Sequence, residues 1–161
     1  MIQTIAGQLQ TTNGILHANL EDVDHEASVR QPMPAGNCLN WIVGHLVAAY
    51  DNLLPVLGSE PVLSPEQKKI YERGARPLTD PAQAMPFDEL RNAWTTAHER
   101  VIEGLARLSE NRLAEPAPFS PANNPDETIG SLLAIFAFHQ AYHVGQLGLG
   151  RRVAGLDGAV A

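Results

Sequence analysis

Apolar side chains recur at intervals of three and four residues along four stretches of the chain. This is the pattern of helices that bury one face. The stretches cover residues 2–27, 39–57, 87–109 and 127–153. No segment of useful length alternates with period two, so the sequence predicts no β-sheet. Four amphipathic helices bury their apolar faces most simply against one another, and we therefore expect an all-α four-helix bundle.

Local signals mark the ends of these predicted helices. Asn37 and Asp126 stand where N-caps are expected for the second and fourth helices. Gly58 and Gly155 follow the same two helices, and glycine commonly ends a helix in the left-handed conformation. Pro55 should distort the last turn of the second helix, because proline has no amide hydrogen to donate.

Two long connections join the predicted helices. Residues 58–86 separate the second helix from the third, and Ser64 is placed to cap a short helix over residues 65–73. The proline- and asparagine-rich residues 116–125 precede the fourth helix. Connections of this length permit a crossover topology. We expect one domain over residues 1–161, because that length suits a single core.

Composition narrows the class of protein. The net charge is −7, and the only adjacent basic pairs are Lys68-Lys69 and Arg151-Arg152, so we expect no nucleic-acid partner. Cys38 is the single cysteine, which excludes an internal disulfide and a cysteine-rich zinc site. The first ten residues lack the basic start of a signal peptide, and no apolar run approaches about 18 residues. The sequence therefore predicts no membrane span and favours the cytoplasm.

Histidines provide the chemistry on the buried face of the fourth helix. His139 and His143 are four residues apart, so their rings lie on one face of a helix and can converge on one ion. His45 lies beside the apolar stripe of the second helix and is the natural third ligand, since bundle metal sites are built from facing helices. The preceding Gly44 would let a neighbouring helix approach closely.

A plainer interpretation stands beside this one. Six histidines give a pair four residues apart by chance roughly one time in six, and an inward histidine is more often a hydrogen-bonded core residue. His17 and His25 fall off the stripe of the first helix and should be solvated. His98 lies beside the stripe of the third helix, where a structural role is favoured over a place at the site.

Two segments resemble a known family. The run from Thr128 to Arg152 holds His139-Gln-Ala-Tyr-His143, then Gly-Gln, then arginines at the helix end, and it is similar to the last helix of the DinB/YfiT-like metalloenzymes. Residues 39–46, Leu-Asn-Trp-Ile-Val-Gly-His-Leu, resemble their second helix. The resemblance implies a four-helix bundle with a crossover connection, a homodimer, and a divalent metal, commonly nickel or zinc, on His45, His139 and His143.

Three neutral imidazoles would leave an ion its full charge and at least one open position, as in catalytic sites. Such ligands suit zinc, nickel, copper or iron better than magnesium or calcium, and manganese is a further alternative. Family members with known activity include thiol-dependent transferases. The first hypothesis is accordingly a transferase that joins a low-molecular-weight thiol to a small electrophile.

Two other hypotheses stay open at this point: a hydrolase that uses a metal-bound hydroxide, and a non-catalytic, metal-stabilised binding module. Gln140 follows the first histidine where a zinc protease has its glutamate, which slightly disfavours the hydrolase. No general acid or base is identified. Asp51, Glu127 or the connection over residues 58–86 could reach the site.

Overall fold

A computed structural model describes residues 1–32 and 36–159. Four long helices form the body of the fold: α1 (Ile2–Leu20), α3 (Leu39–Leu53), α5 (Phe87–Arg107) and α6 (Ile129–Val153). Shorter elements join them: α2 (His25–Ser28), α4 (Pro65–Tyr71), and the 3₁₀ turns η1 (Leu54–Leu57), η2 (Pro81–Gln83) and η3 (Glu110–Ala114). Extended structure among the described residues amounts to one isolated bridge, between Pro116 and Thr128. The all-α prediction is confirmed.

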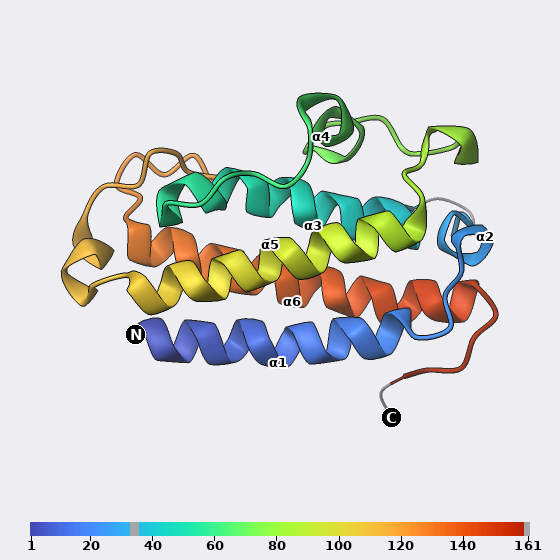
Figure 1. Cartoon of the computed structure of the whole chain (residues 1–161), viewed down its shortest axis with the longest axis horizontal. Helices are drawn as coiled ribbons and strands as arrows, with labels where there is room; N and C mark the ends of the chain where they lie inside the picture. The colour runs from blue at the N-terminus through green and yellow to red at the C-terminus, as the bar shows by residue number, and fades with distance from the viewer. Residues whose placement is uncertain (33–35, 160–161) are drawn as a thin grey trace.

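The four long helices form a bundle with a crossover. α1 packs against α6 and α5, and α3 packs against α5 and α6. Figure 1 shows that α1 and α6 run in one direction and α3 and α5 in the other. Because α3 and α5 are parallel neighbours, the connection over residues 58–86 must return along the length of the bundle, and it carries α4 outside α3 (Figure 1). This is the crossover that the sequence predicted.

The prediction of one helix over residues 2–27 is wrong at its C-terminal end. α1 stops at Leu20, where Asp22 takes a left-handed conformation with φ of 60°. Asp24 then caps α2 by accepting a hydrogen bond from the amide of Ala27. Aspartate tolerates the left-handed region and caps helices well, so these two residues redirect the chain.

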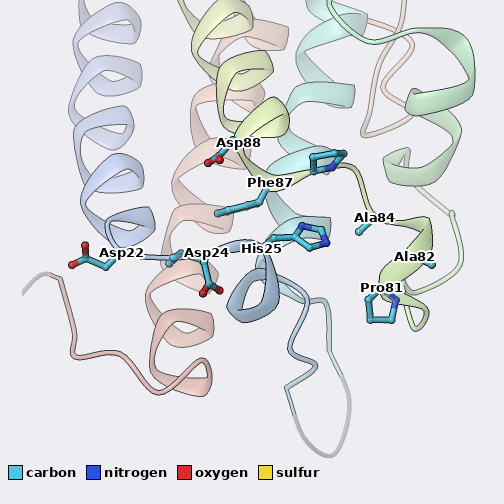
Figure 2. A pocket seen from close by; sticks show the side chains of 10 residues that line it. Asp22, Asp24, His25, Pro81, Ala82, Ala84, Phe87 and Asp88 are labelled. Atoms are coloured by element: carbon cyan, nitrogen blue, oxygen red, sulfur yellow. The ribbon is translucent and has the colours of Figure 1, made fainter.

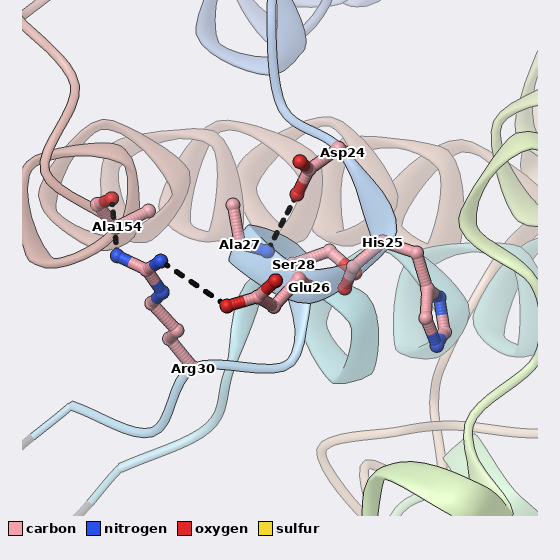
Figure 3. A network of polar contacts seen from close by, with 7 residues as sticks. All are labelled: Asp24, His25, Glu26, Ala27, Ser28, Arg30 and Ala154. Atoms are coloured by element: carbon pink, nitrogen blue, oxygen red, sulfur yellow. Dashed lines mark hydrogen bonds and ion pairs between the residues drawn. The ribbon is translucent and has the colours of Figure 1, made fainter.

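Arg30 ties the residues after α2 to the C-terminal end of α6, which lies at the same end of the bundle. Its guanidinium donates to the carbonyl of Ala154, just beyond α6, at 3.0 Å and pairs with Glu26 at 3.6 Å (Figure 3). Gly155 follows with φ of 88°, as expected for the residue that ends α6. The segment that follows α2 and the residue that follows α6 are therefore joined by a polar contact.

The predicted N-caps are both displaced. Cys38 rather than Asn37 precedes α3, without a side-chain cap bond. Thr128 rather than Asp126 caps α6, in a reciprocal pair of hydrogen bonds with Ser131. Threonine and serine three residues apart satisfy two amides at once, whereas Asp126 lies too early to reach the first turn.

Other end signals act as predicted. Gly58 ends η1 with φ of 75°, and Pro55 lies within that 3₁₀ turn, where the second helix tightens. Ser64 caps α4 in a capping box with Gln67, although α4 ends at Tyr71, two residues early. None of the helices among the described residues is both long and apolar enough to cross a membrane.

Candidate metal centre

Three histidine rings meet between α3 and α6. His45 lies at the middle of α3, and His139 and His143 lie one turn apart on α6. The Nε2 atom of His139 is 3.2 Å from Nε2 of His45 and 3.1 Å from Nε2 of His143. Two nitrogens bound at 2.0–2.1 Å to one tetrahedral ion stand about 3.3 Å apart. The spacing of the three nitrogens therefore fits shared coordination of one ion.

Hydrogen bonds outside the cluster fix the tautomers of two rings. His45 donates from Nδ1 to the carbonyl oxygen of Tyr71 at 2.8 Å, and His143 donates from Nδ1 to Oε1 of Gln146 at 2.7 Å. A neutral imidazole has one N–H. The Nε2 atom of each of these two rings is therefore unprotonated, and its lone pair points into the cluster. Metal-binding histidines are oriented in this way by an acceptor behind the ring.

His139 lacks such an acceptor. Its Nδ1 atom is buried and has no hydrogen-bond partner among the described residues. Its Nε2 atom nevertheless faces both neighbouring rings, whose centroids lie 5.1 Å (His45) and 4.5 Å (His143) away. The donor set of three imidazole nitrogens is one that zinc, nickel, copper and iron accept. The three residues present therefore fit a divalent transition metal.

Burial keeps these rings neutral. Only 9% of His45 and 8% of His143 is exposed. Burial lowers the pKa of His139 to about 3, with the other two histidines adding to the effect. Burial, and then the neighbouring His45, lower the pKa of His143 to about 4, and burial also lowers the pKa of His45. All three rings are thus ready to bind a metal at neutral pH without first losing a proton.

The sequence around His45 prepares its position. A Cβ atom on Gly44 would lie 2.3 Å from the ring of Tyr71, so only glycine lets that ring pack directly on α3. The close packing brings the carbonyl of Tyr71 to His45. The Tyr71 hydroxyl donates to Asn40 at 2.8 Å and accepts from the amide of Met85, also at 2.8 Å. Trp41 stacks on the other side of His45, with ring centroids 4.7 Å apart.

A cavity of about 290 Å³ opens beside the cluster. His45 and His139 form part of its wall, and the remaining lining residues are Ala48, Ala49, Asn52, Arg73, Phe119, Pro121, Ile135 and Phe136. Its volume is at the lower end of the range for small-molecule sites, about 300–1,000 Å³. A small ligand held there would be in contact with two of the three histidines.

The acidic residues that the sequence left open do not join the site. Asp51 accepts hydrogen bonds from the amides of Val62 and Leu63 at 2.7 and 2.9 Å and so holds the start of the long connection. Glu127 accepts from Ser120 and Ser131. Neither carboxylate lines the cavity. Both are structural residues.

Gln140 also faces away from the cluster. It is fully buried, donates to the carbonyl of Leu9 at 2.9 Å and to Thr12 at 2.6 Å, and accepts from Tyr50. These partners hold its side chain between α1 and α3, and all of its hydrogen bonds are made to residues outside the histidine cluster. Its position after His139 is therefore no substitute for a protease glutamate.

The other histidines behave as predicted. His17 and His25 are exposed. His98 is buried, lies 3.3 Å from the carbonyl of Leu9 and stacks near Trp94, so its role is structural. His25 borders a larger, open hollow of about 600 Å³ together with Asp22, Asp24 and Asp88 (Figure 2). In the described part of the chain, only the triad gathers three potential metal ligands.

Sequence reasoning missed three functional positions. Tyr71 acts through its main-chain carbonyl, which no residue pattern reveals. Gln146 was noted only within the family motif, yet its place three residues after His143 is the distance at which helical side chains meet. Arg73 reaches the cavity from the long connection, whose path the sequence did not predict.

Comparisons with known proteins identify the fold and the family. A conserved protein from Enterococcus faecalis, known from its crystal structure, superposes with a TM-score of 0.73 over 96% of each chain at 16% identity, which shows a shared fold. No curated protein matches the sequence. The sequence pattern of the DinB superfamily matches residues 8–147, a span that includes all three clustered histidines, the whole of residues 39–46 and residues 128–147 of the other resembling segment. The chain belongs to the DinB superfamily.

Proposed function

We propose that this protein is a metal-dependent enzyme that binds one divalent ion, zinc or nickel, on His45, His139 and His143. The observation that carries the proposal is the convergence of three Nε2 atoms. Those of His45 and His143 are unprotonated, because the Nδ1 atom of each ring donates its hydrogen to an acceptor outside the cluster. Three protein ligands would leave the ion open to a further ligand, and the cavity that His45 and His139 line would give a small molecule access to it, as in a catalytic rather than a structural site.

Transfer of a low-molecular-weight thiol to a small electrophile is the activity we favour. A bound ion would supply a positive centre that stabilises a thiolate. The chain itself orients the metal-binding imidazoles and keeps water away from the electrophile. Tyr71 and Gln146 hold two of the imidazoles in place, and Phe119 and Phe136 give the cavity an apolar wall that excludes water from the electrophile.

Hydrolysis is the second candidate, and a non-catalytic binding module is the third. Hydrolysis of esters or amides commonly uses a carboxylate base beside the metal. The described residues that line the cavity include no aspartate or glutamate. This favours transfer of a thiol, because a thiol has a pKa near 8.5 and a bound cation would lower it enough for the proton to pass to solvent without a carboxylate base.

Metal analysis tests the site directly. Protein purified without a metal-binding tag should carry about one equivalent of transition metal, and His143→Ala should carry much less. His17→Ala is the matched control, because His17 is exposed and distant from the cluster. Equal metal content in the His143→Ala and His17→Ala variants would refute the metal site.

Activity assays separate the three functions. Metal-loaded protein should accelerate thioether formation between one of a panel of thiols and 1-chloro-2,4-dinitrobenzene, and His143→Ala should abolish the acceleration. Turnover of esters or amides without any response to thiols would support the hydrolase. Bound metal with neither activity would support the binding module.

We also infer a homodimer formed through the outer face of α6. Phe138, Tyr142, Leu149 and Val153 are 71%, 55%, 68% and 46% exposed and recur at helical spacing. An exposed apolar stripe of this kind marks an interaction surface. Two chains of net charge −7 approach most easily through an uncharged face. Sedimentation should give a dimer, and Leu149→Lys should give a monomer; a monomeric unmodified protein would contradict this.

A further inference from the structure

The described residues that line the cavity beside the histidines carry positive charge and no negative charge. Arg73 is the only charged residue among those described in its lining. Asn52, also in the lining, accepts a hydrogen bond from the ammonium group of Lys68 at 2.7 Å, so a second cation lies at its edge. The chain as a whole is acidic, with a net charge of −7. The described lining thus carries one positive charge and no negative charge, which favours a negatively charged ligand.

Arg73 is available to bind an anion. One of its guanidinium nitrogens donates to the carbonyl of Pro121 at 2.8 Å, which holds the side chain between α4 and the loop over residues 116–125. None of the ion pairs found in the described structure involves Arg73. A guanidinium has five N–H donors, so at least one edge is left to meet a carboxylate.

The rest of the cavity is apolar. Phe119 and Phe136 pack edge to face with ring centroids 6.4 Å apart, and Ala48, Ala49 and Ile135 complete the wall between Arg73 and the histidines. The ligand must therefore present an apolar body to these side chains. The volume of about 290 Å³ limits that body to about the size of one ring with a short chain.

We propose that the cavity binds a small carboxylate with an apolar body, whose carboxylate pairs with Arg73 and whose other end lies against His45 and His139. This inference rests on the proposed function, since it names the substrate class of the same site. It assigns Arg73 the role of selecting the ligand by charge.

A matched pair of probes tests this assignment. 3-Phenylpropionate and 3-phenylpropionamide share shape and differ in charge. Calorimetry on zinc-loaded protein should show the carboxylate binding about fivefold or more tightly than the amide. Arg73→Gln should remove most of this preference and Arg73→Lys should keep part of it. Arg76→Gln, an exposed arginine in the same connection that does not line the cavity, should leave the preference unchanged.

The same titrations on chelator-treated protein separate the two proposals, because a carboxylate can also bind zinc directly. A preference for the carboxylate that persists without zinc and is lost in Arg73→Gln supports the inference even if the proposed metal function fails. A preference that disappears with zinc and is unaffected by Arg73→Gln overturns the inference and leaves the metal site standing. Equal binding of the two probes in zinc-loaded protein also overturns it.

Discussion

Replacing Gly44 with alanine should weaken metal binding although Gly44 itself offers no ligand. The added Cβ would lie 2.3, 2.4 and 2.6 Å from Cδ1, Cγ and Cε1 of Tyr71. Ordinary carbon contacts are about 3.5–4.0 Å, so the ring must move by about 1 Å. Tyr71 is fully buried and its hydroxyl is held by Asn40 and Met85, so the ring cannot simply swing aside. The carbonyl that orients His45 must shift with it.

The magnitude follows from two opposed effects. Overpacking a buried ring costs about 1–3 kcal/mol, and alanine gains about 1 kcal/mol over glycine within a helix. The free energy of unfolding should therefore fall by about 0–2 kcal/mol, which leaves the protein folded. Loss of the acceptor behind a metal-binding histidine lowers metal affinity by about 10–100-fold. Gly44→Ala should therefore lower the metal affinity much more than it lowers the free energy of unfolding.

Gly14→Ala is the matched control. Gly14 lies in α1, and a Cβ atom added there would have nothing within 4 Å, so this variant should be more stable by about 0.5–1 kcal/mol with unchanged zinc affinity. Chelator competition gives the zinc affinity and urea unfolding gives the stability. If Gly44→Ala binds zinc as tightly as Gly14→Ala, the proposed link from Gly44 through Tyr71 to His45 is wrong.

Three further predictions concern the site and the residues that support the fold around it. Gln146→Leu removes the acceptor of His143 and should lower zinc affinity about tenfold with little change in stability, unlike Gln8→Leu on the exposed face of α1. Asp51→Ala should lower the free energy of unfolding by about 1–3 kcal/mol without changing the metal content per folded chain. With zinc removed, stability should fall from pH 6.5 toward pH 4, because the unfolded chain protonates His143 near 6.5 whereas the folded ring, with its pKa lowered to about 4, resists protonation.

The pH effect has a definite sign and size. Each ring that is neutral when folded and protonated when unfolded lowers the free energy of unfolding by about 1.4 kcal/mol for every pH unit between its two pKa values. Urea unfolding at pH 7, 6 and 5 measures how steeply the free energy of unfolding depends on pH. His143→Ala removes one of the titrating rings and should reduce this slope by the contribution of that ring. A flat profile over this range would contradict the burial of neutral histidines. Unchanged affinity in Gln146→Leu, or lost metal in Asp51→Ala, would contradict the roles given to those residues.

Periodicity predicted the long helices well because each of them buries one face, and the apolar residues of that face recur at helical spacing in the sequence. Residues 87–109 and 127–153 were expected, and α5 and α6 begin and end within two residues of those limits. The break after Leu20 was missed because the apolar stripe continues to Val23, which is buried, although the backbone there is no longer helical. A stripe records burial, and burial alone does not distinguish a helix from the turn that follows it.

The site was predicted only in part, for a similar reason. The spacing of His139 and His143 fixes their common face, because both lie on one helix. That His45 meets them depends on how α3 packs on α6, which the resemblance implied and the structure shows. Tyr71 and Arg73 enter through the connection over residues 58–86, and the path of a loop follows from tertiary contacts rather than from periodicity.

The histidine cluster itself argues against the plainer interpretation of three hydrogen-bonded core residues. Three neutral imidazoles carry three N–H groups, and His45 and His143 use theirs on oxygen acceptors outside the cluster. The one remaining proton, on His139, lies either on Nδ1, where it has no acceptor, or on Nε2, where it can be donated to only one of the two neighbouring Nε2 lone pairs and leaves Nδ1 without a partner. Either choice leaves a buried polar atom unsatisfied, at a cost of about 1–3 kcal/mol. A cation at the centre would use all three Nε2 lone pairs and leave only the Nδ1 proton of His139 without a partner, whereas the metal-free cluster always leaves at least one Nε2 lone pair unused as well. The number of available protons therefore favours a metal.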